Sequence, residues 1–167
     1  MLYRFLLLAG LGFNVNQMAM AENPDTVTCL VIQGTFENAF YKSSESCTVE
    51  VLRDGVVQAT LKLTRMRRKF WYPFERDCCY TLRVTKSGFA TMLISVDTRR
   101  ADRSDALYQL DFTARLITNK RAKTMNQDAL NIPYAHITYD ESAGVFLADQ
   151  KYTEKVKAEL VLRGKML

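Results

Sequence analysis

The sequence predicts a mainly β fold, an antiparallel Greek-key β-sandwich with a short C-terminal α/β extension. Residues 47–98 contain several short segments in which apolar and polar residues alternate. Because successive side chains on a strand point to opposite faces, each segment offers one apolar face to a core. Turn-forming residues such as Asp54-Gly55 separate the segments. A series of half-buried strands joined by turns is typical of a layered antiparallel domain.

Each expected strand is bounded by turn residues. Asp54-Gly55 is the strongest hairpin signal in the chain. Gly34 predicts a bend or bulge in the first strand, and Pro73 predicts that its own strand lies at a sheet edge or ends there. We therefore expect strands at residues 27–36, 47–53, 56–64, 70–74, 78–86, 90–97 and 105–117.

The N-terminus has the pattern of an export signal. Arg4 precedes an apolar run over residues 5–13, and Ala19-Met20-Ala21 resembles a cleavage site. The run is shorter than the ~20 residues that span a bilayer. We predict a signal peptide at 1–21 and an exported protein, in the periplasm, at the outer-membrane periphery or outside the cell. An uncleaved membrane anchor is the alternative.

The remaining chain divides into a β-sandwich at 22–117 and an extension at 118–167 that packs on it. The polar segment 119–131 predicts a loop or one short helical turn. An extended segment at 132–139 and a return strand at 145–147 predict a hairpin. Asp149 is placed to cap a terminal helix, because Tyr152, Val156 and Leu160 follow at helical spacing.

The chain carries a formal net charge of +5, and its basic residues gather in three clusters. Such clusters bind nucleic acid, anionic lipid or an acidic partner. Export argues against nucleic acid and favours another envelope protein as the partner. The alternative is that the clusters are solvated loops. Their members are Arg65, Arg67, Arg68 and Lys69; Arg99, Arg100 and Arg103; and Lys120, Arg121 and Lys123.

Four cysteines allow a disulfide in an oxidising compartment. By strand parity Cys29, Cys47 and Cys78 face the core, whereas Cys79 faces outward. A Cys47–Cys78 disulfide is one candidate, and buried free thiols that pack as small hydrophobes are the alternative. There is no Cys-x-x-Cys motif, so neither redox nor zinc chemistry is favoured.

The sequence favours no catalytic residue, metal site or cofactor. His136 is the only histidine, and on a strand it shares a face with Thr138 and Asp140. A protein zinc site needs three or four ligands, and no other ligands follow at a fixed spacing. Neither a Gly-x-Ser-x-Gly motif nor a phosphate-binding glycine loop is present. We therefore expect a protein that is not an enzyme.

The aromatic run at residues 70–74 follows the first basic cluster and provides the candidate interaction surface. If Phe70, Tyr72 and Phe74 face inward, Trp71 faces solvent and is free to stack on a sugar, a lipid interface or a partner. The alternative is that the whole run belongs to the core. The candidate surface consists of Arg65, Arg67, Arg68, Lys69 and Trp71.

The order of four motifs resembles the carboxypeptidase regulatory-like, transthyretin-like β-sandwich, in the version found in small exported envelope proteins of Gram-negative bacteria. The run Arg65-Met66-Arg67-Arg68 departs from it, because that family often has a glycine-containing turn there. The motifs are Val31-Ile32-Gln33-Gly34, Val49-Glu50-Val51-Leu52-Arg53-Asp54-Gly55, Lys69-Phe70-Trp71-Tyr72-Pro73-Phe74 and Tyr80-Thr81-Leu82-Arg83-Val84-Thr85-Lys86-Ser87-Gly88-Phe89.

The resemblance implies an accessory, non-catalytic module of the bacterial cell envelope. Together with the basic and aromatic surface, it leads us to expect a binding or structural protein that acts through protein–protein contacts. A glycan- or peptide-binding accessory protein is the alternative. A small hydrolase built around His136 is the least favoured reading.

Overall fold

The structure is a computed structural model that describes residues 27–40, 45–99 and 106–161. The expected signal peptide at 1–21 lies outside the described residues, as do Arg100 and Arg103. Within the described ranges the chain is mainly β, with a C-terminal helix. The elements are β1 (Thr28–Phe36), β2 (Cys47–Arg53), β3 (Val56–Leu63), β4 (Lys69–Glu75), β5 (Cys79–Thr85), β6 (Met92–Asp97), β7 (Tyr108–Ala114), α1 (Asn119–Ala122), α2 (Gln127–Leu130), β8 (Ala135–Asp140), β9 (Val145–Ala148) and α3 (Gln150–Val161).

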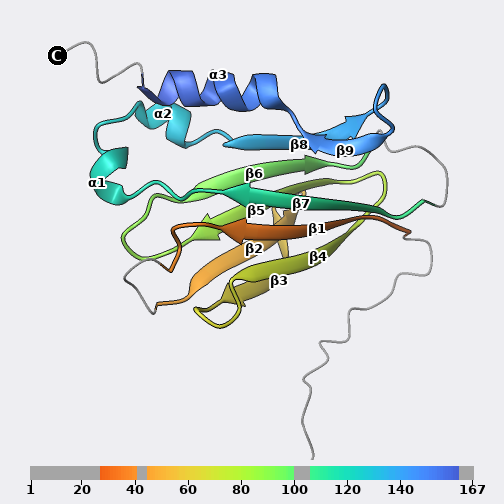
Figure 1. Ribbon diagram of the computed structural model, residues 1–167, viewed down its shortest axis with the longest axis horizontal. Coiled ribbons are helices and arrows are strands. Elements are labelled where there is room, and N and C mark those ends of the chain that lie inside the picture. The colour runs from red at the N-terminus through yellow and green to blue at the C-terminus, as the bar shows by residue number, and fades with distance from the viewer. Residues whose placement is uncertain (1–26, 41–44, 100–105, 162–167) are drawn as a thin grey trace, which may run out of the picture.

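The strands form two sheets, one with the order β4-β1-β7 and one with the order β3-β2-β5-β6-β8-β9 (Figure 1). Most neighbours are antiparallel, but β1 pairs with β7 and β6 pairs with β8 in parallel. The expectation of a wholly antiparallel fold is therefore wrong at these two places. The chain leaves the large sheet after β6 and returns to it at β8, and such a long crossover permits parallel pairing.

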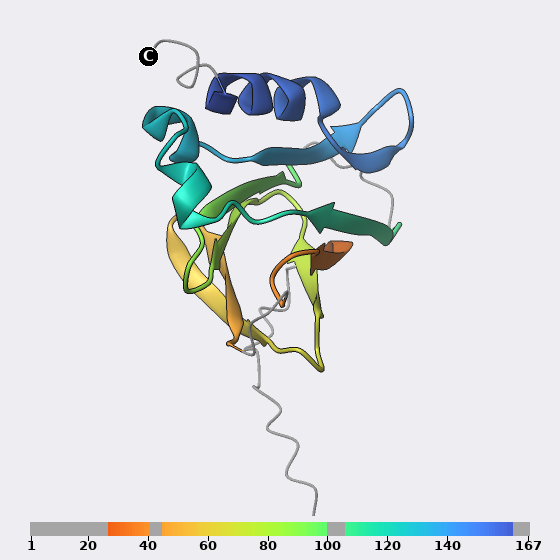
Figure 2. The same ribbon diagram turned by 60° about the vertical axis from the view of Figure 1, so that its left-hand side comes forward.

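Both sheets contribute buried side chains to one hydrophobic core. Figure 2 shows how the strands of the two sheets are arranged around it. Leu30 and Phe74 of the small sheet are fully buried, as are Leu82 and Ile94 of the large sheet. Buried and less buried residues alternate along β4, β5 and β6. In these three strands the period-two pattern of the sequence is therefore the pattern of burial, as predicted.

The turn between β2 and β3 has the geometry that its two residues favour. Asp54 has a φ of 49° and Gly55 a φ of 80°. Two successive residues with positive φ are the requirement of the type I′ hairpin turn, which suits Asp-Gly. The hairpin predicted from Asp54-Gly55 is confirmed.

Gly34 does not mark a bend or bulge, so that expectation is wrong. It pairs regularly with Phe70 of β4, and the register shift of this strand pair lies instead between Thr28 and Leu30. A Cβ atom at position 34 would lie 1.8 Å from Cε1 of Phe70. Glycine occupies this position because the aromatic ring of the neighbouring strand covers it.

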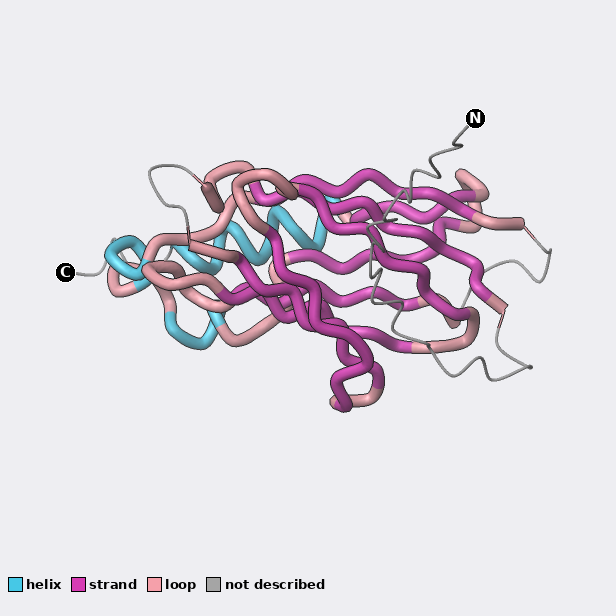
Figure 3. The backbone as a smooth tube through the Cα atoms, turned by 90° about the horizontal axis from the view of Figure 1, so that it is seen from below, coloured by secondary structure: helices cyan, strands magenta, loops and turns pink. Residues whose placement is uncertain are grey.

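The C-terminal extension joins the large sheet, because β8 pairs with β6. Asp149 accepts a hydrogen bond from the Tyr152 backbone N–H at 3.0 Å, so it caps α3 as predicted. Val156 and Leu160 of α3 are buried in a second cluster that includes residues of α2 and the loop before it. Figure 3 shows these helices gathered on one side of the strands. The described chain contains no helix with the length and apolar character needed to cross a membrane.

Candidate interaction surface

Trp71 faces solvent from the edge of the small sheet. Its side chain is 60% exposed, whereas Phe70, Tyr72 and Phe74 on the same strand are 3%, 7% and 0% exposed. The prediction that Trp71 points outward is confirmed, and the alternative that the whole run is core is wrong. β4 is an edge strand, as Pro73 predicted.

The basic residues next to Trp71 are held by a compact turn between β3 and β4. The Thr64 N–H donates to the Arg67 carbonyl at 3.0 Å, and the Arg67 N–H donates to the Thr64 hydroxyl at 3.2 Å. The Arg68 Nε donates to the Arg65 carbonyl at 3.1 Å. A threonine side chain thus closes this turn, which contains no glycine.

The four basic side chains of this turn and the start of β4 are exposed, and they form no ion pair with a carboxylate among the described residues. Arg65, Arg67, Arg68 and Lys69 are all exposed, and none of them forms an ion pair with a described carboxylate. We call these four residues and Trp71 the basic-aromatic surface. Aromatic and arginine side chains are enriched at the energetic centres of protein interfaces. The arrangement is suited to an acidic partner with an apolar or planar group for Trp71.

Met66 belongs to the same place, although sequence reasoning did not select it. It lies at the tip of the turn with 95% of its surface exposed. Its position between arginines in a turn is the signal that could have identified it. Because methionine is flexible and polarizable, it adapts to partner surfaces of varied shape.

A buried hydroxyl fixes the far end of β4. The Thr98 hydroxyl donates to the Glu75 carbonyl at 2.7 Å and accepts from the Cys78 N–H at 3.0 Å. Thr98 is fully buried. It therefore ties the β4–β5 turn, which contains the positive-φ residue Asp77, to the end of β6.

The strand register excludes the Cys47–Cys78 disulfide. Thr48 pairs with Thr85 at one end of the β2–β5 ladder, and Arg53 pairs with Tyr80 at the other end. Cys47 lies beyond one end of this ladder and Cys78 beyond the other. The ladder alone spans five strand steps, so the two residues are more than ~16 Å apart. A disulfide joins Cα atoms that are less than ~7 Å apart. The candidate disulfide is a wrong prediction, because strand parity does not show which ends of two strands meet.

The cysteines are free thiols, and Cys29, Cys47 and Cys78 are buried as predicted. Burial raises the pKa of the Cys47 thiol to about 11, against the opposing effect of Lys86. Burial also raises the pKa of Cys29. These thiols stay protonated near neutral pH, and thiols are weak nucleophiles in that form.

His136 is half-buried, and its ring packs edge-on against Tyr152 of α3 at a centroid distance of 5.9 Å. The described residues contain no group of three or more His, Cys, Asp or Glu side chains that could hold a metal ion. Cys79, the least buried thiol, has its pKa raised by burial and by the Asp97 carboxylate beside it. The surroundings of Cys79 therefore disfavour a reactive thiolate.

The same carboxylate gives the fold an acid-sensitive contact. Asp97 accepts hydrogen bonds from Arg99 Nη2 at 2.7 Å and from Nε at 3.0 Å, and these bonds lower the pKa of Asp97 from 3.8 to about 2. Because the folded-state pKa is depressed, this contact stabilises the fold above pH 3.8 and is lost as the pH falls towards 2. We expect Asp97→Asn to flatten the loss of stability between pH 4 and pH 2, measured by urea unfolding. An unchanged pH dependence in this variant would contradict the assignment.

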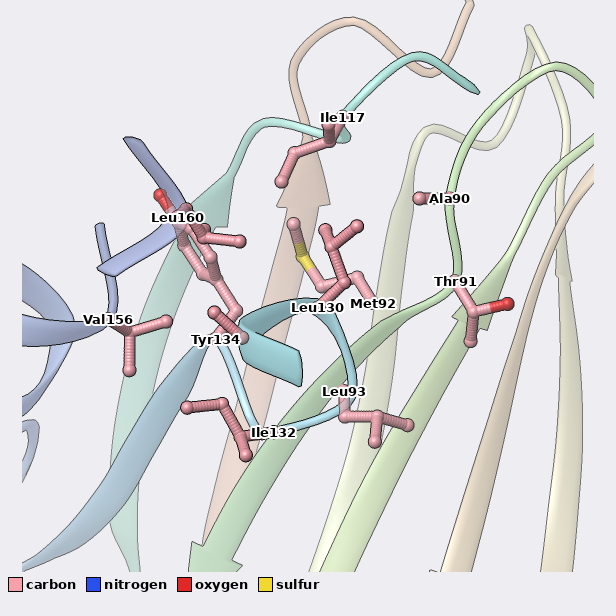
Figure 4. A pocket seen from close by; sticks show the side chains of 11 residues that line it. Ala90, Thr91, Met92, Leu93, Ile117, Leu130, Ile132, Tyr134, Val156 and Leu160 are labelled. Atoms are coloured by element: carbon pink, nitrogen blue, oxygen red, sulfur yellow. The ribbon is translucent and has the colours of Figure 1, made fainter. Parts of the chain in front are cut away.

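The described chain has one small apolar cavity near the helices and two larger open grooves. The apolar pocket of Figure 4, beneath α2 and α3, has a volume of about 20 Å³, which is enough for about one water molecule. A groove of about 480 Å³, lined by both polar and apolar residues, lies beside α1 and α2. A third groove, of about 580 Å³, lies between β7 and α3. Neither His136 nor Trp71 lines any of the three.

No protein-family model, curated protein or solved structure matches this chain. The resemblance to the carboxypeptidase regulatory-like and transthyretin-like sandwich therefore stays a prediction. What the protein does has to be inferred from its surfaces.

Proposed function

We propose that the protein is a non-catalytic binding or structural module of the bacterial cell envelope, exported from the cytoplasm, which acts through protein–protein contacts at the basic-aromatic surface. The observation that carries this proposal is Trp71, an indole 60% exposed on an edge strand. Four basic side chains without a described acidic partner lie next to it in sequence. The raised pKa values of Cys29, Cys47 and Cys79 also argue against nucleophilic catalysis by these thiols.

We further propose that the two sheets form a Greek-key β-sandwich of the transthyretin-like kind. Two features support this. The sheets share one core, and the chain changes sheet between β1 and β2, between β3 and β4, between β4 and β5, between β6 and β7 and between β7 and β8. In such a sandwich, loops and edge strands are the parts left free for recognition.

The partner surface is expected to be acidic. Unpaired cations at a rim speed the encounter with an acidic surface, and salt weakens this effect. Trp71 would contribute affinity by burying its large apolar ring. We therefore expect added salt to weaken binding, because salt screens the charges of the arginines. We also expect removal of the Trp71 indole to weaken binding, because its apolar contact with the partner is lost.

A glycan- or peptide-binding accessory protein is the second candidate, and one observation favours it. Trp71, Gln33 and Asp111 stand opposite one another on the three strands of the small sheet. The Gln33 side-chain amide donates to Asp111 Oδ1 at 3.0 Å. A ring beside amide and carboxylate groups, spaced by strand separations of about 4.8 Å, provides both stacking and hydrogen bonds for a sugar.

The proposed function is tested by chemical crosslinking of the tagged full-length protein in cells of its source bacterium. We expect Trp71→Ala and the double variant Arg67→Glu/Arg68→Glu each to reduce the captured partner at least tenfold. The matched control is Lys120→Glu/Arg121→Glu, which makes the same charge change on α1 and should retain capture. Equal losses in the control and the test variant would contradict a role for this surface.

The glycan alternative has its own readout. The purified protein is tested for binding to immobilised envelope polysaccharide. If it binds, and if both Trp71→Ala and Gln33→Ala abolish the binding, the partner is a glycan and not a protein. If only a protein is captured and Gln33→Ala has no effect, the first proposal stands.

A further inference from the structure

The two sheets have unequal widths, and this leaves one strand edge open. The large sheet continues beyond β6 with β8 and β9, whereas the small sheet ends at β7. No described strand pairs with the outer edge of β7. Figure 2 shows β7 facing the hairpin of β8 and β9, with α3 beyond it.

The hydrogen-bonding direction of β7 follows from one backbone hydrogen bond between Ala114, at its end, and the residue just after β1. The Glu37 N–H donates to the Ala114 carbonyl at 3.0 Å, so Ala114 directs its backbone groups toward β1. Because this direction alternates along a strand, Gln109, Asp111 and Thr113 direct their N–H and C=O groups toward the open edge. The open edge thus presents a row of backbone donors and acceptors.

A groove runs along this edge. Its volume is about 580 Å³, within the range of pockets that bind small molecules and cofactors. β7 contributes Leu110 and Phe112 to it, and β9 contributes Leu147, which is 39% exposed. Its other wall is made by the first turns of α3, with Gln150, Thr153, Glu154 and Lys157. The groove therefore combines backbone hydrogen-bonding groups, apolar side chains and a helical wall.

We propose that this groove binds one extended polypeptide segment of a partner protein, which pairs with β7 as a fourth strand of the small sheet. Main-chain pairing with an exposed edge supplies affinity, and alternate side chains supply specificity. The apolar groove residues require apolar side chains on one face of the segment. The charged groove residues are two carboxylates, Asp111 and Glu154, and one ammonium, Lys157. Because the groove carries one more negative than positive charge, a basic residue in the segment is favoured.

Two features argue for a single strand at this edge and against other occupants. Because α3 forms a wall of the groove, a second folded copy cannot bring its own sheet edge against β7. The opposite edge of the small sheet is protected, since Pro73 lacks an N–H and Lys69 places a charge there. β7 is therefore the edge of this sheet at which a strand is expected to add.

The proposal is tested with a displayed library of random heptapeptides selected on the purified full chain. We expect the selected peptides to alternate apolar and polar residues and to carry a basic residue. They should bind wild type and Thr113→Ala equally, and should bind Thr113→Pro at least tenfold more weakly. The N–H of Thr113 faces away from β1, so proline removes a group that only the added strand uses.

Two further measurements cover the case in which Thr113→Pro does not fold. In hydrogen exchange of the wild type, the Asp111 and Thr113 amides should become protected when a selected peptide binds. Glu154→Lys should weaken binding of the basic peptides at least tenfold. Failure to select any peptide, equal binding by Glu154→Lys, or unchanged exchange at these two amides would overturn the proposal. Trp71→Ala should bind the peptides normally, so the outcome is independent of the basic-aromatic surface.

Discussion

Replacing Phe74 by alanine is expected to lower the free energy of unfolding by about 3–5 kcal/mol. Phe74 is fully buried, and its ring packs edge-on against Tyr72 and Tyr80, each at a centroid distance of 5.0 Å. Tyr80 belongs to the other sheet, so the ring joins the two sheets at the centre of the core. Its loss removes buried apolar area and leaves a cavity that the strands cannot close. Urea unfolding followed by far-ultraviolet circular dichroism measures the change.

Trp71→Ala is the matched control, because it truncates a larger aromatic residue on the outer face of the same strand. We expect it to change the free energy of unfolding by less than about 1 kcal/mol, as is usual for exposed positions. If the Trp71 variant were as destabilised as the Phe74 variant, the assignment of inner and outer faces on β4 would be wrong.

Gly34→Ala is expected to cost about 1–3 kcal/mol, although it adds only one methyl group. The new Cβ would lie 1.8 Å from Cε1 and 2.2 Å from Cζ of Phe70. The Phe70 ring stacks on Phe36 at 6.0 Å with an interplanar angle of 18°. It therefore cannot move aside without disturbing a second buried ring. Thermal and urea unfolding of the purified variant measure the effect.

A double-mutant cycle identifies the cause of the Gly34 effect. Phe70→Leu shortens the side chain that occupies the space, so the double variant should be less destabilised than the sum of the two single variants. Strict additivity would mean that the cost arises from the backbone of β1 and not from the contact with Phe70.

The local features of this fold could be predicted from the sequence because their causes are local. Asp54-Gly55 selects its turn by its own backbone preferences. The alternation at residues 70–74 decided which aromatic side chains face the core, including the outward direction of Trp71. The cap of α3 by Asp149 depends on residues only three positions away.

The features that the sequence did not reveal depend on which strands are neighbours. The separation of Cys47 from Cys78 follows from the register of β2 with β5. The role of Gly34 follows from the contact with Phe70, which belongs to another strand. The open edge of β7 exists because β8 pairs with β6 in the other sheet. Alternation along one strand contains no information about partners, so such features require the structure.

The most direct test of the central claim, recognition by contact at the basic-aromatic surface, is site-specific photocrosslinking in intact cells. A photo-reactive phenylalanine analogue is placed at position 71 and, as a control, at Val145, an exposed position on β9. We predict one dominant crosslinked protein from position 71 that is absent from position 145. Crosslinks of equal pattern from both positions, or none from position 71, would contradict the claim.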